Sequence, residues 1–275
     1  MKIWEAILYG ILGGLTEILP ISFTGHATVF SIIFALSPLT SGEGLYISTA
    51  INLGIILAIF FAFRAETSAA CSELRAMMKK RSRVRRLPLR RSIFMGLFAL
   101  FPMLLSLIFY AAAERITRLL YIALFFALNG FVMILCSRRT EGQKDERTLM
   151  LPDALLLGTA RMLAVFPGLS GIGAALSVGH ARGLSGKYNL RFCFLLSLPF
   201  YIVCLIYRLI RAIAFGRFIS SLLLPMLLAM LLSTIMGYFS IQYLKYLYRK
   251  NRFNFFAYYC WDAAVIVLIL ALINA

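Results

Sequence analysis

Long apolar runs alternate with short basic segments along the whole chain. The apolar segments are 3–36, 45–63, 92–113, 119–136, 153–181, 192–207, 218–244 and 254–273. Most of them approach or exceed the roughly 18 residues that a helix needs to cross a bilayer. The runs are continuous, whereas a membrane β-barrel needs alternating strands. The pattern predicts an all-α polytopic membrane protein in which residues 1–275 form one transmembrane domain.

Two of the apolar segments are interrupted in a similar way. The first contains "ILPISFTG" (18–25) and the second "VFPGLSGIG" (165–173), each with an apolar lead, a proline, a serine and a glycine. Paired interruptions in corresponding halves of a chain are typical of inverted repeats whose broken helices meet at a site. The pattern predicts two re-entrant helix pairs, with a first repeat over about 1–136 and a second over about 153–275.

The net charge of +17 comes with a composition that is 61% hydrophobic. Of the 28 Lys and Arg residues, 21 lie in four segments between apolar runs: 64–91, 138–147, 182–191 and 245–252. This clustering is typical of loops on the cytoplasmic side of a membrane. Nucleic-acid binding needs a basic folded face with interleaved aromatic residues, and the sequence has no such pattern. We therefore predict a basic cytoplasmic loop at 64–91 and exclude nucleic acid as a partner.

The five cysteines are scattered and form no CxxC or CxxH pair. They are Cys71, Cys136, Cys193, Cys204 and Cys260. A disulfide framework or a zinc site is therefore not expected, and the cysteines are predicted to be reduced.

Polar residues inside the first interrupted segment raise the question of a site. A carboxylate at membrane depth costs about 2.5–3.5 kcal/mol, so Glu17 should face a cavity or a partner unless it lies at the interface. His26 follows nine residues later and is either a packing residue or an acid–base partner of Glu17. Ser22, Thr24 and Gly25 can satisfy the backbone groups freed by Pro20, or those groups can bind an anion.

The second interruption can likewise be interpreted as an anion site or as a place where helices pack. Gly168 and Ser170 lie at the start of a helix, where free backbone N–H groups can hold a phosphate. Small residues are also common where membrane helices pack closely. Arg161 precedes this turn within an apolar run. Its side chain either reaches the cytoplasmic headgroups, or pairs with Glu17 or an anionic substrate.

These motifs resemble those of the undecaprenyl-diphosphate phosphatase family, the bacitracin-resistance type of integral membrane phosphatase. "GGLTEILPISFTGH" (13–26) is similar to the family's E-G-L-T-E-F-L-P-V-S-S-T-G-H, and "PGLSGIGAA" (167–175) to its P-G-x-S-R-S-G-A-T. Further matches are "INLGIILAIF" (51–60), "DALLLGTARMLAVFPG" (153–168) and "GLSGKYNLRFCFLLSLP" (183–199). The resemblance implies interdigitated inverted repeats with two re-entrant helix pairs. It also implies hydrolysis of undecaprenyl diphosphate to undecaprenyl phosphate, which recycles the lipid carrier of cell-wall synthesis.

The resemblance also suggests roles for single residues. Catalysis is assigned to Glu17, His26 and Ser22, and a divalent cation, Mg²⁺ or Ca²⁺, to Glu17 if the protein is active. Substrate binding is assigned to Thr24, Gly25, Gly168 and Ser170, to which we add Arg161 from its position in an apolar helix.

Several family positions are substituted in this chain. They are Gly13 for the first glutamate, Phe23 for the second serine, Gly171 for the arginine that binds diphosphate, Ile172 for the next serine, and Ala175 for the closing threonine. Loss of such an arginine typically costs about 100- to 1,000-fold in rate. Arg161 stands where the family usually has glutamine, and could reach the vacated space.

Two classes of function are therefore compatible with the sequence. One is a lipid diphosphate phosphatase with a remodelled site, and the other is a non-catalytic binder or transporter of polyprenyl phosphates. A structural partner in a cell-wall complex is a third option. The expected partners are a polyprenyl phosphate or diphosphate lipid and the bilayer, with a homodimer as a possible assembly. The expected location is the bacterial plasma membrane, crossed several times.

The charge distribution generates a prediction about topology. We expect segment 64–91 to be cytoplasmic and Ala275 to be external, because 21 of the 28 basic residues then lie inside. A reporter fused at Ala275 that requires the external side should be active, and one that requires the cytoplasm should be silent. A clear cytoplasmic signal at Ala275 would overturn the re-entrant arrangement.

Overall fold

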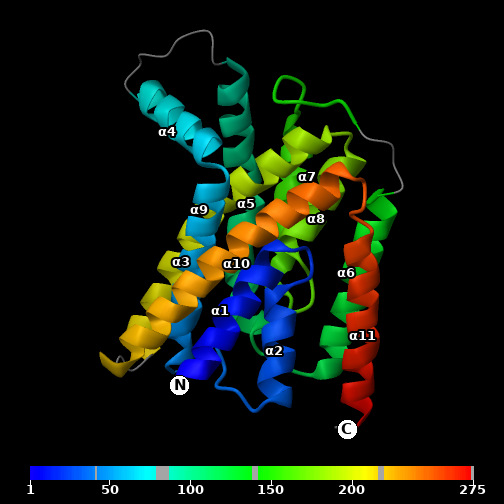
Figure 1. Ribbon diagram of the computed structural model, residues 1–275. Coiled ribbons are helices and arrows are strands. Elements are labelled where there is room, and N and C mark those ends of the chain that lie inside the picture. Colours follow the sequence, from blue (N-terminus) through cyan, green and yellow to red (C-terminus); the bar gives the residue numbers. More distant parts are fainter. Residues whose placement is uncertain (41, 79–86, 138–141, 216–219, 274–275) are drawn as a thin grey trace.

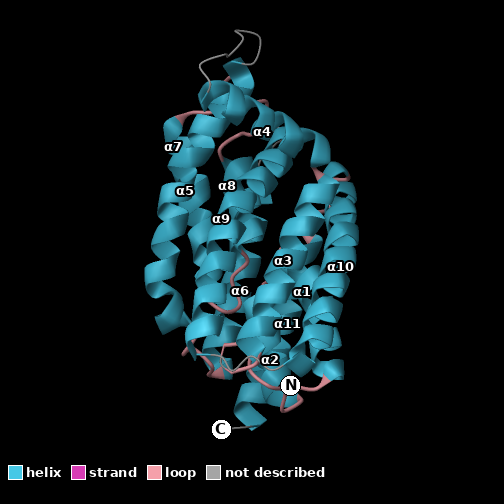
Figure 2. Cartoon of the chain, turned by 90° about the vertical axis from the view of Figure 1, so that its left-hand side faces the viewer, coloured by secondary structure: helices cyan, strands magenta, loops and turns pink. Residues whose placement is uncertain are grey.

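The computed structural model describes residues 1–40, 42–78, 87–137, 142–215 and 220–273, and helices account for its regular structure there (Figures 1 and 2). The helices are α1 (Ile3–Ile18), α2 (Phe23–Ile33), α3 (Gly44–Ala62), α4 (Arg64–Met78), α5 (Leu87–Ala113), α6 (Leu119–Ser137), α7 (Leu151–Met162), α8 (Gly171–Ala181), α9 (Gly186–Phe215), α10 (Leu223–Arg249) and α11 (Phe255–Ile273). Two short 3₁₀ turns, η2 (Leu163–Val165) and η3 (Ser220–Leu222), follow α7 and precede α10. The predicted all-helical class is confirmed.

Five helical stretches within the described ranges are long and apolar enough to cross a membrane. They are Gly44–Ala62, Pro88–Tyr110, Gly186–Ala214, Ser220–Arg249 and Phe255–Ile273. Their outer faces carry large exposed apolar side chains, such as Ile108 and Leu272, each 72% exposed. Apolar surface of this extent is stable in lipid and not in water. The prediction of a polytopic membrane protein is therefore supported.

The helix ends differ from the predicted apolar segments. α9 covers Gly186–Phe215 where 192–207 was predicted, and α10 continues to Arg249, past the predicted end at 244. α4 lies within the predicted loop 64–91. Apolar runs mark only the part of a helix inside the membrane, and Lys, Arg and Glu at its ends are good helix formers. Residues 79–86 and 138–141 of the predicted basic loops, and Arg217, lie outside the described residues.

The two interrupted segments form helix pairs that enter the bundle from opposite ends. In Figure 1, α1 and α2 both have their outer ends at the lower end, and α7 and α8 both have theirs at the upper end. α11 ends at the lower end, opposite α4. Re-entrant pairs need this arrangement. Re-entry into the bilayer, the inverted repeats and the 1–136 and 153–275 division stay predictions.

Small residues hold α1, α3 and α10 close together. A Cβ added to Gly14 of α1 would lie 2.7 Å from Met236 Cβ and 2.8 Å from the carbonyl oxygen of Ser233, both on α10. A Cβ on Gly54 of α3 would overlap the Ser233 hydroxyl. Close backbone approach through small residues is a common way to join helices in membranes. This packing fixes α1, and with it the position of the first interruption.

The close approach at Gly14 predicts that substitution by alanine destabilises the protein there, and not at a glycine with open space around it. We expect Gly14→Ala to lower the free energy of unfolding by about 1–3 kcal/mol, because a backbone atom of α10 must move. The matched control is Gly96→Ala in α5, where an added Cβ meets nothing within 4 Å. That change should be neutral or stabilise by up to about 1 kcal/mol. Equal thermal unfolding of the two variants in detergent would contradict this account of the packing.

Candidate functional site

The two interruptions pack directly against each other in the middle of the bundle. A Cβ on Gly25, in α2, would lie 2.7 Å from the backbone nitrogen of Gly168. A Cβ on Gly173, in α8, would lie 2.8 Å from Cβ of Pro20. Each turn therefore contacts a glycine of the helix that follows the other turn. Gly168 itself has a φ of 111°, a conformation that glycine adopts without strain.

A serine begins each of the two short helices that follow the interruptions. Ser22 Oγ accepts a hydrogen bond from Gly25 N at 3.3 Å, and Ser170 Oγ accepts one from Gly173 N at 3.1 Å. In each case the serine is the N-cap residue of its helix and accepts a hydrogen bond from the backbone N–H three residues later. Ser22 Oγ also accepts from Gly168 N at 3.0 Å, so that it joins the two turns. Ser22 holds a φ of 69°, a strained conformation for serine.

Asn129 of α6 supplies a second connection between the turns. Its Nδ2 donates to the carbonyl oxygen of Pro20 at 3.0 Å, and its Oδ1 accepts from Ser170 N at 3.0 Å. Asn129 is 1% exposed. One amide therefore satisfies a backbone acceptor of the first turn and a backbone donor of the second. Backbone groups at membrane depth that lack such partners cost several kcal/mol each.

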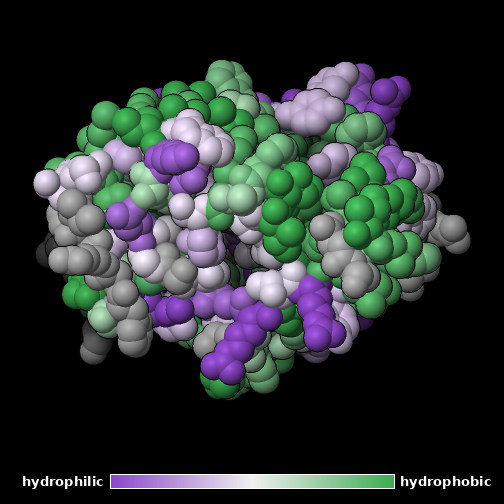
Figure 3. Space-filling view, turned by 90° about the horizontal axis from the view of Figure 1, so that it is seen from below, coloured by the Kyte–Doolittle hydropathy of each residue, from purple (hydrophilic) through white to green (hydrophobic). Residues whose placement is uncertain are grey.

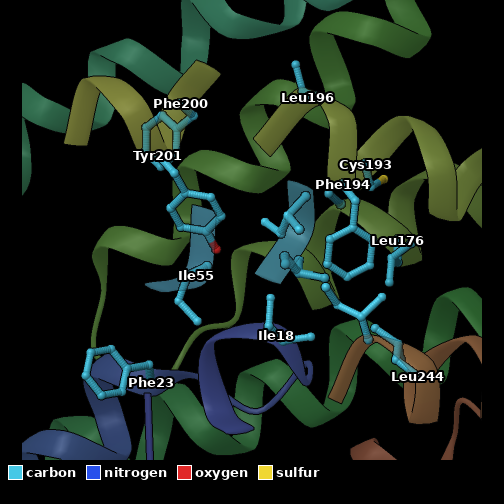
Figure 4. Packing of buried hydrophobic residues seen from close by; sticks show 14 of the residues in the cluster. Ile18, Phe23, Ile55, Leu176, Cys193, Phe194, Leu196, Phe200, Tyr201 and Leu244 are labelled. Carbon is cyan, nitrogen blue, oxygen red and sulfur yellow. The ribbon is translucent and has the colours of Figure 1, made fainter. Parts of the chain in front are cut away.

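Glu17 lies at the end of α1, beside two residues from other helices. Tyr201 of α9 donates its hydroxyl proton to Glu17 Oε1 at 2.6 Å. The guanidinium of Arg161 is 3.8 Å from the same oxygen. Figure 4 shows Tyr201 descending from α9, with its hydroxyl oxygen pointing away from Phe200. The carboxylate is thus neutralised by Arg161 and oriented by Tyr201. Oε2 of Glu17 has no hydrogen-bond partner in the ranges that the structure describes.

Arg161 points into the bundle interior and does not reach the headgroups. Its side chain is 2% exposed, and Nε donates to Ser197 Oγ at 3.3 Å. The guanidinium lies over the rings of Phe200 and Tyr201, with its carbon 5.4 and 5.0 Å from their centroids. Nη2 has no hydrogen-bond partner among the described residues. Nη2 is the nitrogen 3.8 Å from Glu17 Oε1, so that this buried cation has an ion-pair partner but one donor group without a hydrogen bond.

The guanidinium of Arg161 occupies the space beside Gly171. A Cβ added at Gly171 would overlap Nη1 of Arg161 and would lie 2.6 Å from Ala164 Cβ. The carbonyl oxygen of Arg161 would be 2.8 Å away. A side chain at position 171 therefore requires the Arg161 guanidinium to move away, and it also requires Ala164 and the Arg161 carbonyl group to shift. The two substitutions noted in the sequence, glycine at 171 and arginine at 161, are complementary in space.

Small cavities surround these side chains. One of about 60 Å³ has a lining that includes Glu17, Asn52, Arg161, Tyr201 and Arg208, together with Thr24, Ser106, Tyr110 and apolar residues; we call it the inner cavity. A narrower cleft beside it is lined by Glu17, Ser22, Thr24, Ser170 and Gly171, among others. The structure thus brings most of the predicted site residues to one place.

His26 differs from the other predicted site residues. Its Nδ1 is 2.7 Å from the carbonyl oxygen of Ser22, and its Nε2 is 2.8 Å from the hydroxyl oxygen of Tyr259 on α11. It lines none of the described cavities that contain Glu17. Gly25 packs against Gly168 and lies outside these linings too. The catalytic role of His26 and the binding role of Gly25 stay predictions.

The predicted divalent cation finds few ligands. Among the described residues no group of three His, Cys, Asp or Glu side chains is placed to hold a metal ion. Glu17 is a single carboxylate beside a guanidinium, whereas Mg²⁺ and Ca²⁺ prefer several oxygen ligands. These residues do not fit a cation held by the protein alone. The cation stays a prediction, and no step below uses it.

Three residues of the site went unnoticed or unassigned in the sequence. Asn129 stands alone in the apolar run "LFFALNGFVMIL", and Tyr201 and Arg208 lie in "LPFYIVCLIYRLI". A single polar residue in a span is a signal for a partner. The direction in which each residue points depends on helix packing, which the sequence does not reveal.

The fold and the site define a class of multi-pass membrane proteins with a charged centre where two broken helices meet. The chain belongs to the family described as "Bacitracin resistance protein BacA", whose model matches residues 6–266.

Curated relatives match the chain over almost its whole length. The undecaprenyl-diphosphatase of Methanobrevibacter smithii is 29% identical over 97% of both chains. That of Carboxydothermus hydrogenoformans is 27% identical over 98% of both, and undecaprenyl-diphosphatase 1 of Shouchella clausii is 26% identical over 98% of this chain and 96% of the relative. The predicted family is confirmed, and with it a location in a membrane crossed several times.

The bridging role of Asn129 predicts a large effect on stability. We expect Asn129→Leu to destabilise the protein by about 2–5 kcal/mol, because the buried N–H of Ser170 loses its partner and the carbonyl oxygen of Pro20 keeps only the Cys260 thiol at 3.8 Å. The matched control is Ser177→Ala, since the buried Ser177 hydroxyl has no partner among the described residues. Thermal unfolding in detergent measures both. A loss no larger for Asn129→Leu than for Ser177→Ala would contradict the proposed bridge.

Proposed function

We propose that this protein binds undecaprenyl diphosphate, with the diphosphate in the inner cavity beside Arg161, and hydrolyses it to undecaprenyl phosphate. The observation that carries the proposal is the placement of the Arg161 guanidinium in the space beside Gly171, next to Glu17. The names of the relatives supply the substrate class.

Electrostatics favours an anion in this cavity. Arg161 and Arg208 both line it, and Glu17 is the one carboxylate among its lining residues. A guanidinium can form two parallel hydrogen bonds with a phosphate, and these are stronger in a low-dielectric surrounding. Nη2 of Arg161 lies 3.8 Å from Glu17 Oε1 but forms no hydrogen bond among the described residues, so that it can still donate one to a phosphate. The tyrosine hydroxyl on Oε1 of Glu17 leaves Oε2 available to accept a proton from water or a hydroxyl group.

Thr24 is a better candidate than Ser22 for a hydroxyl that meets substrate. Ser22 is 3% exposed, and its oxygen already accepts from Gly25 N and Gly168 N. Thr24 is half-buried and lines both the inner cavity and the cleft. We therefore assign Ser22 to holding the turns together and Thr24 to contact with the substrate.

A non-catalytic binder or transporter of polyprenyl phosphates is the second candidate. It is favoured by the single carboxylate in the inner cavity and by the engagement of the Ser22 hydroxyl with backbone amides. Binding needs the cation, whereas hydrolysis also needs groups that move protons. Helix pairs entering from opposite ends would suit alternating access.

Phosphate release from undecaprenyl diphosphate by the purified protein separates the two candidates. The assay is run with added Mg²⁺ or Ca²⁺ and with a chelator. Release above a Glu17→Gln control supports the phosphatase. Saturable binding of undecaprenyl diphosphate without phosphate release supports the binder. If the protein neither binds nor hydrolyses undecaprenyl diphosphate, the proposed function is wrong.

The Arg161 site generates a prediction about binding. We expect Arg161→Gln to weaken binding of undecaprenyl diphosphate by about 10- to 1,000-fold, because a buried donor to the phosphate is lost. Arg182→Gln is the matched control, since Arg182 pairs with Asp153 at 2.6 Å and lines none of these cavities. If both variants lose the same affinity for undecaprenyl diphosphate, Arg161 does not contact the bound diphosphate.

A double-mutant comparison tests the exclusion between positions 161 and 171. Gly171→Ala should weaken binding in the parent protein, since its Cβ displaces the Arg161 guanidinium. The same change should cost much less when Arg161→Gln is already present. Gly171→Arg in that background should recover only part of the binding, because Ala164 must shift to admit any side chain. Fully additive losses would refute the exclusion.

A further inference from the structure

A second cavity, which we call the outer cavity, lies next to the inner one. It has a volume of about 120 Å³ and is formed by residues from α1, α2, α3, α5, η2 and α9, and from the segments that precede α3, follow α5 and precede α8. The two cavities share Phe23, Thr24, Tyr110, Val165 and Arg208 in their linings. In Figure 3, which views the lower end of the bundle, hydrophilic side chains gather beside a central recess. The site at Glu17 and Arg161 does not account for this cavity, because neither residue lines it.

Arg208 lines both cavities, and it contacts Ser48, which lines the outer cavity and not the inner one. Its Nη1 donates to the carbonyl oxygen of Ser48 at 3.4 Å, and its guanidinium carbon lies 5.8 Å from the centre of the Tyr110 ring. Its buried Nε has no partner, and no carboxylate of the described chain lies within ion-pair distance of it. Arg208 belongs to α9, one of the helices able to cross the membrane. A cation at that depth usually lines a polar cavity or meets a counter-ion.

The other charges of the outer cavity do not neutralise Arg208. Arg211 Nη1 forms an ion pair with Glu114 at 2.5 Å, and Nη2 donates weakly to Thr40 O at 3.5 Å. Arg208, Arg211 and Glu114 are the charged residues in the described lining, so that the cavity carries one net positive charge. Hydroxyl groups of Thr40 and Thr117 also line it. A small oxyanion fits this combination of excess positive charge and hydroxyl donors.

We propose that the outer cavity is a second anion site, in which Arg208 binds a phosphate group. The phosphate is either inorganic phosphate or the headgroup of a phosphorylated lipid, and both present the same oxygens to the guanidinium. This site goes beyond the proposed function, since a phosphate binds there whether or not the inner site acts on a lipid diphosphate. Its position beside the inner cavity suits a phosphate group that arrives at or leaves that site.

Direct binding to the purified full-length protein in nanodiscs tests the proposal. Radiolabelled inorganic phosphate is the probe in one arm, and radiolabelled farnesyl monophosphate in the other. The parent should bind at least one probe saturably, and Arg208→Gln should weaken that binding about tenfold or more. Arg118→Gln is the matched control, because Arg118 is an exposed arginine that lines neither cavity. It should bind like the parent.

A gain of binding guards against a variant that merely fails to fold. Glu114→Gln removes the one carboxylate of the outer cavity and releases Arg211, so that it should tighten binding about threefold or more. Arg208→Lys keeps the charge and should retain part of the affinity.

The two arms identify the source of the phosphate. Binding of inorganic phosphate supports a free anion, and binding of farnesyl monophosphate alone supports a lipid headgroup. The proposal is overturned if the parent binds neither probe, or if Arg208→Gln binds as tightly as the parent. It is also overturned if Arg161→Gln alone abolishes binding, a result that leaves the proposed function of the inner site intact.

Discussion

The hydrogen bonds that close the two interrupted helices are the constraint on which the rest of the structure depends. Interrupting a helix at membrane depth frees backbone groups that lipid cannot satisfy. Here the side-chain amide of Asn129 donates to the carbonyl oxygen of Pro20 and accepts from the backbone N–H of Ser170. The amide of Gly168 meets Ser22 Oγ. Each interruption is therefore stabilised by the other, and neither turn can be moved alone.

The charged site follows from this closure. Once the turns are joined, the end of α1 brings Glu17 to the end of α7, where Arg161 lies. Tyr201 from α9 completes the group by binding the same carboxylate oxygen. An isolated cation in this position would be costly, and its proximity to Glu17 and two aromatic rings offsets part of that cost. Donor groups on Arg161 and Arg208 that form no hydrogen bond are the groups that we propose bind anions.

Much of the fold could be predicted from the sequence, because lipid imposes simple rules. Continuous apolar runs marked the spans, and Pro20 and Pro167 marked the two interruptions. The N-cap roles of Ser22 and Ser170 were less visible, since serine in a membrane segment also fits close packing. The ends of α9 and α10 were misjudged, because a helix continues past the apolar run into the polar region. The pairing of Arg161 with Glu17 was one of several open alternatives, and the bridge by Asn129 was not foreseen. Both depend on helix rotation, which local sequence does not encode.

The central claim is that the joined turns present Arg161 to the phosphate groups of a polyprenyl diphosphate. A cryo-electron microscopy structure of the full-length protein in nanodiscs with farnesyl diphosphate tests it most directly. The account predicts phosphate oxygens within hydrogen-bond distance of the Arg161 guanidinium, between Glu17 and Thr24. Headgroup density at another place, with the inner cavity empty and Arg161 unchanged beside Gly171, would contradict it.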